Sequence, residues 1–210
     1  MRQVLEAGLP ALGLDTAAIP ALERFAEMLL QRNRVMNLTA ITEPRDVAAL
    51  HLLDSLALIS LAGLEDGSAV DVGTGAGFPG LPLAIVRPRL QVTLLDSLGK
   101  RVGFLREVCE TLGVTNAECV QGRAEEFAGE RREVYDWAVS RAVAALPVLC
   151  ELCLPLVRVG GCFLAMKSSH TEAEIEQAGG AVRILGGRIA WIRDYMIPTT
   201  EVVHRVVCVE

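Results

Sequence analysis

The segment from Asp71 to Gly80 reads DVGTGAGFPG, and its residue types and spacing could hold a ligand. Four glycines and one proline fall within these ten residues, directly after the apolar pair Ala69 and Val70. Glycine at this density weakens strands and helices, but it lets the backbone turn tightly and lets another molecule approach without meeting a side chain. The segment therefore predicts a strand-to-helix turn that binds a ligand along its backbone. The alternative is a tight turn that holds nothing.

An acidic residue, Asp96, ends the next predicted strand, LQVTLLD, 19 residues after Gly77. In doubly wound sheets, ligands bind beyond the carboxyl ends of the strands, and an acid at this place accepts hydrogen bonds from ribose hydroxyls. The loop and the acid together predict a nucleoside-cofactor site. Phe78 stands where a dinucleotide-binding loop has its third glycine. The observed G-x-G-x-G spacing resembles the first motif of S-adenosylmethionine-dependent methyltransferases, and Asp71 suits a cationic ligand.

The elements that position this loop follow from hydrophobic periodicity. Segments that predict strands alternate with segments of helical spacing, and two further strand segments end the chain. Predicted strands lie at 68–73, 90–96, 117–121, 136–142 and 161–167 and within 183–198 and 201–210. Predicted helices lie at 20–34, from Pro44 to Leu61, from Pro79 onward, after a cap at Ser97, at 146–157 and near 171–178.

Alternating strands and helices predict a parallel sheet with helices on both faces, and the final pair of strands predicts an antiparallel finish. We therefore expect an α/β fold of the Rossmann-like class I methyltransferase type. It has a mostly parallel seven-stranded sheet with helices on both faces. Residues 1–66 are expected to form a small N-terminal helical extension, and residues 67–210 the cofactor-binding methyltransferase domain.

Composition agrees with a globular protein of one domain and a small extension: 210 residues, 51% apolar, with a net charge of -6. The acidic balance argues against a large nucleic-acid surface but allows a local basic patch. The longest apolar stretch, 142–157, is interrupted by two prolines and a glutamate, so it does not predict a membrane span. We expect a cytoplasmic protein with reduced cysteines. The CxxC pair Cys150 and Cys153 is interpreted as core, and no metal is expected.

Several segments together resemble one family. They are DVGTGAGFPGLPLAI, LLDSLGKRVGFLREV, RAEEF, MNLTAI and HLLDSLAL. The chain is similar in these segments to the ribosomal RNA small subunit methyltransferase G group, also called glucose-inhibited division protein B, over roughly residues 30–167. The resemblance implies S-adenosylmethionine as methyl donor and N7 of a guanine in 16S ribosomal RNA as acceptor. The product side would be S-adenosylhomocysteine and 7-methylguanosine.

The resemblance also implies which residues bind the cofactor. It places the methionine part near Gly73 and Phe78, the ribose on Asp96 and the adenine against Ala124 and Glu125. Arg141 matches a family position close to the cofactor and is expected to help position the reacting groups. The complete set expected to bind cofactor is Asp71, Gly73, Gly75, Gly77, Phe78, Asp96, Ala124, Glu125 and Arg141. Two alternatives stay open: Ala124 and Glu125 could simply open a helix, and Arg141 could be a structural ion-pair partner.

Binding of 16S ribosomal RNA within the small subunit would need positive charge and polar loops. The candidates are Arg32, Arg34, Asn37, His51, Lys100, Arg101, Arg123 and Lys167. Solvated surface charge, or a structural role for His51 and Asn37, is the alternative for each. Aromatic residues are only 4% of the chain, so base stacking offers little. We therefore expect an RNA already folded on ribosomal protein as substrate and a monomeric enzyme. The segment VHRVV departs from the family pattern, and His204 and Arg205 receive no role.

The chemistry of the acceptor agrees with what the sequence lacks. Guanine N7 carries a free lone pair and no proton, so methylation needs in-line positioning rather than a base or a covalent intermediate. The chain reads VSRAVAAL where amino-group methyltransferases commonly carry an N/D-P-P-Y/F motif. Neither Cys150 nor Cys153 has a neighbour that would lower its thiol pKa. The alternatives are a methyltransferase acting on another acceptor, an NAD-dependent oxidoreductase and a non-catalytic RNA-binding module.

Overall fold

A seven-stranded sheet forms the centre of the computed structural model, which describes residues 1–210. The strand order is β3-β2-β1-β4-β5-β7-β6. The strands are β1 (Gly67–Val72), β2 (Leu90–Asp96), β3 (Ala117–Gln121), β4 (Tyr135–Arg141), β5 (Val157–Ser168), β6 (Ile189–Met196) and β7 (Val203–Val209). Strands β1 to β5 pair in parallel, whereas β7 runs antiparallel to both β5 and β6. The order reverses between β1 and β4, which is where doubly wound sheets bind ligands.

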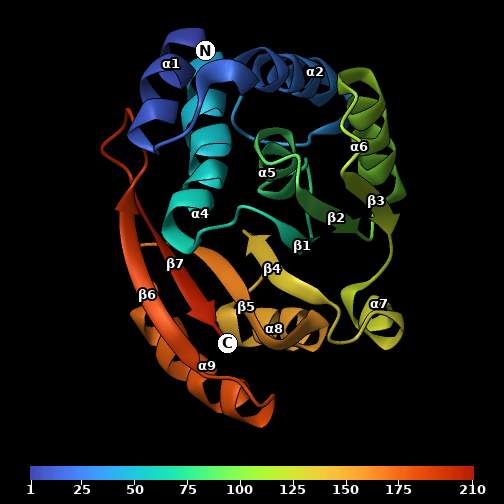
Figure 1. Cartoon of the computed structure of the whole chain (residues 1–210), viewed down its shortest axis with the longest axis vertical. Coiled ribbons are helices and arrows are strands. Elements are labelled where there is room, and N and C mark those ends of the chain that lie inside the picture. Colours follow the sequence, from blue (N-terminus) through green and yellow to red (C-terminus); the bar gives the residue numbers. More distant parts are fainter.

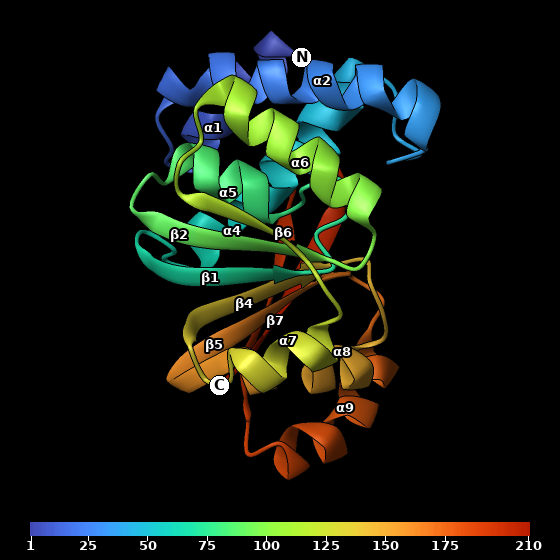
Figure 2. The same cartoon turned by 90° about the vertical axis from the view of Figure 1, so that its right-hand side faces the viewer.

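Two layers of helices cover the sheet (Figures 1 and 2). The N-terminal helices lie with α5 and α6 on one side, and α7, α8 and α9 lie on the other. The first group is α1 (Arg2–Ala11), η1 (Thr16–Ala18), α2 (Ile19–Met36), α3 (Pro44–Asp46), η2 (Val47–Leu53), α4 (Asp54–Ala62), α5 (Gly80–Val86) and α6 (Gly99–Leu112). The second is α7 (Ala124–Glu130), α8 (Leu146–Cys153), η3 (Leu154–Leu156) and α9 (Glu172–Ile184).

The alternation of side chains along the strands divides the core into two apolar clusters. In β5, Leu164 belongs to the cluster under the N-terminal helices, and its neighbours Phe163 and Ala165 belong to the cluster under α8 and α9. Both faces are apolar because both are covered, as in other parallel sheets. Residue 66 lies between α4 and β1, but Leu22 and Phe25 of α2 share the first cluster with the sheet. We therefore propose an extension that folds together with the sheet domain.

Most predicted elements are present, and three details differ. The helix after Pro44 is continuous to Ala62 but contains the seven-residue π-helix η2. The segment 142–157 is a buried helix only from Leu146 to Cys153, and β5 begins at its last residue. Ser97 does not cap α6. The N-cap residue is Leu98, no side chain caps the helix, and Asp96 Oδ1 accepts the amide of Leu98 at 2.8 Å in the turn before α6.

Cys150 and Cys153 lie on α8, fully buried among apolar side chains. Burial raises the pKa of the Cys150 thiol to about 11, and burial also raises the pKa of the Cys153 thiol well above its ordinary value. Metal ligation and disulfide exchange both need thiolate, so these positions suit packing. None of the helices combines the length and apolar character that crossing a bilayer requires.

Candidate active site

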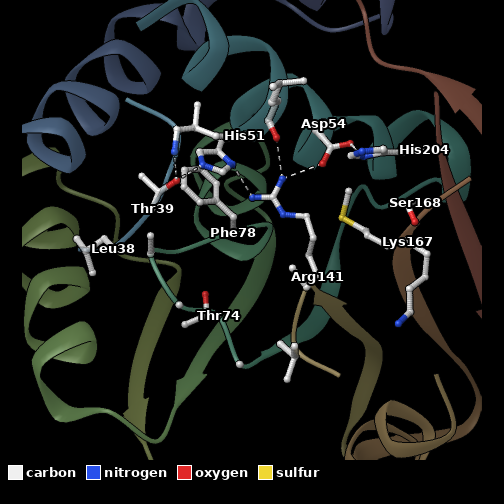
Figure 3. Close-up of a pocket in the computed structure, with 18 of the residues that line it drawn as sticks. Leu38, Thr39, His51, Asp54, Thr74, Phe78, Arg141, Lys167, Ser168 and His204 are labelled. Atoms are coloured by element: carbon white, nitrogen blue, oxygen red, sulfur yellow. Dashed lines mark hydrogen bonds and ion pairs between the residues drawn. The ribbon is translucent and has the colours of Figure 1, made fainter. Parts of the chain in front are cut away.

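A cavity of about 1010 Å³ opens at the carboxyl ends of β1, β2, β4 and β5. Its walls come from the glycine loop 73–78, the segment 38–41 after α2, the π-helix η2, the loop 141–143 after β4 and the ends of β5 and β7 (Figure 3). Segments that are far apart in the sequence therefore meet at the place where a doubly wound fold binds its ligand.

The glycine loop after β1 is shaped by its backbone. Gly73, Gly75 and Gly77 have φ values of +72°, +61° and +106°, a region that strains residues with a side chain. The amides of Gly73 and Thr74 donate to the Leu95 carbonyl of β2 at 2.9 and 3.0 Å, which anchors the loop to the neighbouring strand. A Cβ added at Gly75 would meet nothing closer than the Gly73 carbonyl oxygen at 3.9 Å. Gly75 also lines the cavity, so its backbone is open to a ligand.

Asp71 lies beneath this loop and does not line the cavity. Its fully buried carboxylate accepts the Thr74 hydroxyl and the Gly80 amide on Oδ2, each at 2.7 Å. Burial raises the pKa of Asp71 to about 6, against the lowering effect of these two hydrogen bonds. The residue therefore holds the loop against the start of α5.

Asp96 borders the cavity at the end of β2. Its Oδ2 accepts the Gly75 amide at 2.9 Å and a longer hydrogen bond of 3.3 Å from Arg101, while Oδ1 accepts only the Leu98 amide. A carboxylate oxygen has about two lone-pair positions, so Oδ1 keeps one free. Asp96 thus braces the glycine loop and can still accept a hydrogen bond from a ligand in the cavity.

Asp54, a buried carboxylate at the cavity wall, joins four elements, and Figure 3 shows it beside Arg141 and His204. Its Oδ2 accepts Arg141 at 2.8 Å, and its Oδ1 accepts the Tyr195 hydroxyl at 2.6 Å and lies 2.9 Å from His204 Nδ1. Burial alone would raise the pKa of Asp54. The hydrogen bond from His204, the charge of Arg141 and the hydrogen bond from Tyr195 outweigh burial, so the pKa lies below its ordinary value. Asp54 is therefore a stable carboxylate that ties α4 to β4, β6 and β7.

Arg141 makes further contacts besides its ion pair with Asp54. It donates to the Leu50 carbonyl and to His51 Nδ1, each at 3.1 Å. It also lies 5.1 Å from the centre of the Phe78 ring, on which His51 stacks at 4.6 Å. Only 13% of the Arg141 side chain is exposed. These contacts favour the structural ion-pair interpretation, with Arg141 as a rigid part of the cavity wall.

The family model for rRNA small subunit methyltransferase G matches residues 18–196. The chain belongs to this family. A relative named ribosomal RNA small subunit methyltransferase G, from Alkaliphilus metalliredigens, is 44% identical over 214 residues, covering 100% of this chain and 90% of the relative. The resemblance predicted from the sequence motifs is confirmed.

Two solved structures share the fold at low sequence identity. A SAM-dependent methyltransferase from Aquifex aeolicus matches with a TM-score of 0.57 and 20% identity, over 77% of this chain and 92% of that chain. TYW2 from M. jannaschii, solved in complex with AdoMet, matches with a TM-score of 0.56 and 17% identity, over 69% and 68% of the two chains. The predicted Rossmann-like methyltransferase fold is thereby confirmed for this member of the rRNA small subunit methyltransferase G family.

The structure places only part of the predicted cofactor set around the cavity. Gly73, Gly75, Phe78, Asp96 and Arg141 line it. The residues outside its lining are Asp71, Gly77, Ala124 and Glu125. Ala124 and Glu125 begin α7, in agreement with the alternative that these two residues open a helix. Beyond Asp96, Ser97 and Leu98 form the cavity wall.

Some of the predicted RNA-binding residues of this family member line the cavity, and others lie outside it. His51, Arg101 and Lys167 line the cavity. Lys167 is used internally: its ammonium donates to the Ala144 carbonyl at 2.7 Å and pairs with Glu174 at 2.6 Å. Arg32 forms an ion pair with Glu107. Four of the predicted residues are exposed and outside the cavity: Arg34, Asn37, Lys100 and Arg123.

Sequence reasoning gave no role to four residues of the site. They are Thr39, Asp54, Tyr195 and His204. Asp54 and Thr39 do lie in the segments HLLDSLAL and MNLTAI, which carried the family resemblance. For Asp54, a carboxylate beside apolar helical positions was the available signal.

The titration of His51 is expected to make part of the stability pH-dependent. Burial and then the charge of Arg141 lower the pKa of His51 from 6.5 to about 4. Between these values the unfolded chain binds more protons, so this contribution is present near pH 7 and is lost as the pH falls. The His51→Gln variant keeps a donor and an acceptor. Between pH 7 and pH 4, we expect its free energy of unfolding to fall by about 3 kcal/mol less than that of the original protein.

The comparison with the variant is needed because Asp71 titrates in the opposite sense. Because its pKa is raised to about 6, Asp71 contributes stability at low pH. This contribution is lost as the pH rises past the pKa of an ordinary carboxyl group. Denaturant unfolding of both proteins at a series of pH values measures the difference. Parallel curves from pH 7 to pH 4 would contradict the assignment of a neutral, buried His51.

Proposed function

We propose that this protein transfers a methyl group from S-adenosylmethionine to N7 of a specific guanine in 16S ribosomal RNA. Membership in the rRNA small subunit methyltransferase G family supports the RNA substrate, and the methyltransferase fold supports the donor. One observation carries the proposal: the open backbone of Gly75 and the Asp96 carboxylate are joined by a hydrogen bond of 2.9 Å at one wall of the cavity.

The residues around the cavity fit S-adenosylmethionine. The left-handed backbone at Gly75 offers a surface without a side chain, and Asp96 keeps a free acceptor position for a ribose hydroxyl. Leu98, which is 43% exposed, lines the same wall and offers an apolar contact to a base. When bound, the cofactor supplies a methyl group that its sulfonium charge has already activated.

The task left to the protein is to hold the acceptor nitrogen in line. Guanine N7 has a lone pair and no proton to lose, so no side chain needs to act as a base. The cavity agrees with this requirement, because the nitrogen Nδ1 of His51 already accepts Arg141 and Asp54 already accepts three partners. The stacked His51 and Phe78 rings form a rigid wall that restricts how a base can lie.

Replacing Asp96 by asparagine is expected to weaken S-adenosylhomocysteine binding by about 10- to 100-fold. Each carboxylate oxygen accepts a backbone amide, from Gly75 or Leu98, so the new NH2 group would face one of these donors. The charge-assisted hydrogen bond to a ribose hydroxyl is lost as well. Isothermal titration calorimetry measures the dissociation constant.

Asp136→Asn is the matched control for this measurement. Asp136 also accepts a backbone amide, that of Ser68 at 2.7 Å, and an arginine, Arg158 at 2.7 Å, but it lies at the start of β4. This variant should bind S-adenosylhomocysteine with unchanged affinity. Equal affinity of the Asp96→Asn variant and the original protein would contradict the site.

Ribosomal RNA must be held mainly by charge at exposed positions. The exposed candidates outside the cavity are Arg34, Asn37, Lys100 and Arg123. Such contacts position the RNA and carry little sequence information. With a net charge of -6, the protein offers a small basic surface. We therefore propose an assembled small subunit in the cytoplasm as substrate and one chain as the active unit.

Methylation of purified small subunits tests the proposed function. Subunits that lack the modification are incubated with the protein and labelled S-adenosylmethionine, and the RNA is then cleaved at 7-methylguanosine. We expect one cleavage position in 16S ribosomal RNA and slower reaction of protein-free RNA. Label on another nucleotide, or none, would contradict the proposal.

A further inference from the structure

A directed chain of hydrogen bonds runs from Asp54 to the hydroxyl of Thr39 at the cavity (Figure 3). Arg141 donates to Asp54 and, through its second nitrogen, to Nδ1 of His51 at 3.1 Å. An arginine side chain can only donate, so His51 Nδ1 must accept. A neutral imidazole that accepts on Nδ1 carries its proton on Nε2. His51 is neutral near pH 7 because burial and Arg141 lower its pKa to about 4.

The orientation of His51 determines what Thr39 can do. Nε2 of His51 lies 2.8 Å from Thr39 Oγ1 and donates to it. The amide of Ile41 donates to the same oxygen at 3.0 Å. A threonine hydroxyl has two acceptor positions and one proton. Both acceptor positions are taken, and no group of the protein accepts the proton.

The backbone of Thr39 is held in place from α2. The side-chain amide of Asn33 donates to the Thr39 carbonyl, and its oxygen accepts the Thr39 amide, each at 2.9 Å. Thr39 also lines the cavity. The site therefore presents a fixed hydroxyl that can donate to a ligand and cannot accept from it.

We propose that the Thr39 hydroxyl donates a hydrogen bond to O6 of the target guanine and selects guanine over adenine at the methylated position. This inference rests on the proposed function and names a specificity residue for it. Guanine presents two acceptors, N7 and O6, along this edge, whereas adenine presents the N6 amino donor in place of O6. Guanine O6 can accept the proton of a donor-only hydroxyl beside N7. Adenine would place its N6 amino group against this hydroxyl, and two donors would be left without acceptors.

The test compares Thr39→Val with Thr39→Ser on unmethylated small subunits. Valine keeps the shape of threonine but removes the hydroxyl, whereas serine keeps the hydroxyl. We expect kcat/KM for the subunit to fall by about 10- to 100-fold in Thr39→Val and to stay within about threefold of the original protein in Thr39→Ser. The affinity for S-adenosylhomocysteine, measured by calorimetry, should stay unchanged in both variants, which also shows that the cavity is intact.

A second threonine provides the matched control. Thr200 has the same local pattern, since its hydroxyl accepts the Val202 amide two residues later at 3.0 Å, but its hydroxyl proton is donated to the Ile197 carbonyl. Thr200→Val should therefore methylate subunits at the original rate. A comparable loss in Thr200→Val would attribute the Thr39 effect to local folding and overturn the assignment.

Further outcomes separate this inference from the proposed function. If the original protein forms 7-methylguanosine and Thr39→Val forms it equally fast, the Thr39 assignment fails and the function stands. If Thr39→Val loses affinity for S-adenosylhomocysteine to the same extent as it loses activity, the hydroxyl faces the cofactor and the assignment to guanine fails. If the original protein forms no 7-methylguanosine, both proposals fail.

Discussion

Replacing Gly75 by alanine will reduce the affinity for S-adenosylhomocysteine by about 100-fold or more while the protein still folds. Gly75 has φ +61° and lines the cavity. The added Cβ has room in the protein, because only the Gly73 carbonyl oxygen lies within 4 Å, at 3.9 Å. The methyl group would therefore occupy ligand space, and the backbone strain would cost about 1–2 kcal/mol of folding free energy. Calorimetry gives the affinity and denaturant unfolding gives the stability.

Gly113→Ala is the matched control because it separates strain from obstruction. Gly113 ends α6 with φ +66°, and a Cβ there would also meet nothing within 4 Å. Both variants should lose similar stability, but only Gly75→Ala should lose cofactor affinity. If both variants bound S-adenosylhomocysteine as the original protein does, the glycine loop would not be the cofactor site.

The second large effect is expected from Asp54→Ala, which should lower the free energy of unfolding by about 3–5 kcal/mol. Asp54 is fully buried and is the common acceptor of Arg141, Tyr195 and His204. Its removal leaves the Arg141 charge, only 13% exposed, without its carboxylate partner. For a chain of this size the melting temperature should fall by about 6–20 °C, which differential scanning calorimetry measures.

A surface ion pair supplies the comparison for Asp54. Glu27 pairs with Arg24 at 3.2 Å on α2, and 61% of the Glu27 side chain is exposed. Glu27→Gln should change the free energy of unfolding by less than about 1 kcal/mol, because solvent screens exposed pairs. An Asp54→Ala variant as stable as Glu27→Gln would show that the buried network does not hold α4 against the sheet.

The wall formed by the glycine loop and Asp96 could be predicted because its signals are local in the chain. The glycines of DVGTGAGFPG lie within ten residues, and their type reports the backbone conformation that the positive φ values show. Asp96 could be predicted as a site residue because it stands at the end of an apolar strand. The parallel order of the strands follows from the alternation of strand and helix patterns, since crossover connections leave few topologies.

Some errors of prediction arose where a local pattern fits two structures. Ser97 is a good helix cap by type, yet α6 begins two residues later, after Leu98, and no side chain caps it. Ala124 and Glu125 match a family motif and also open α7 outside the cavity lining, so their contact with adenine stays a prediction. The apolar stretch 142–157 carries a helix and then the start of β5, because hydrophobicity alone does not separate a buried helix from a buried strand.

The amino-acid sequence by itself determined the fold class, the family and the glycine loop, because these depend on periodicity and on neighbouring residues. Only the tertiary structure decided the polar network of Thr39, His51, Asp54, Arg141 and His204. Hydrogen-bonded partners in this network are separated by as many as 150 residues along the sequence. Hydrogen bonds require donor and acceptor within about 3 Å. No spacing along the chain reports such distances, so the packing of the N-terminal helices on the sheet decides which proton Thr39 presents to the cavity.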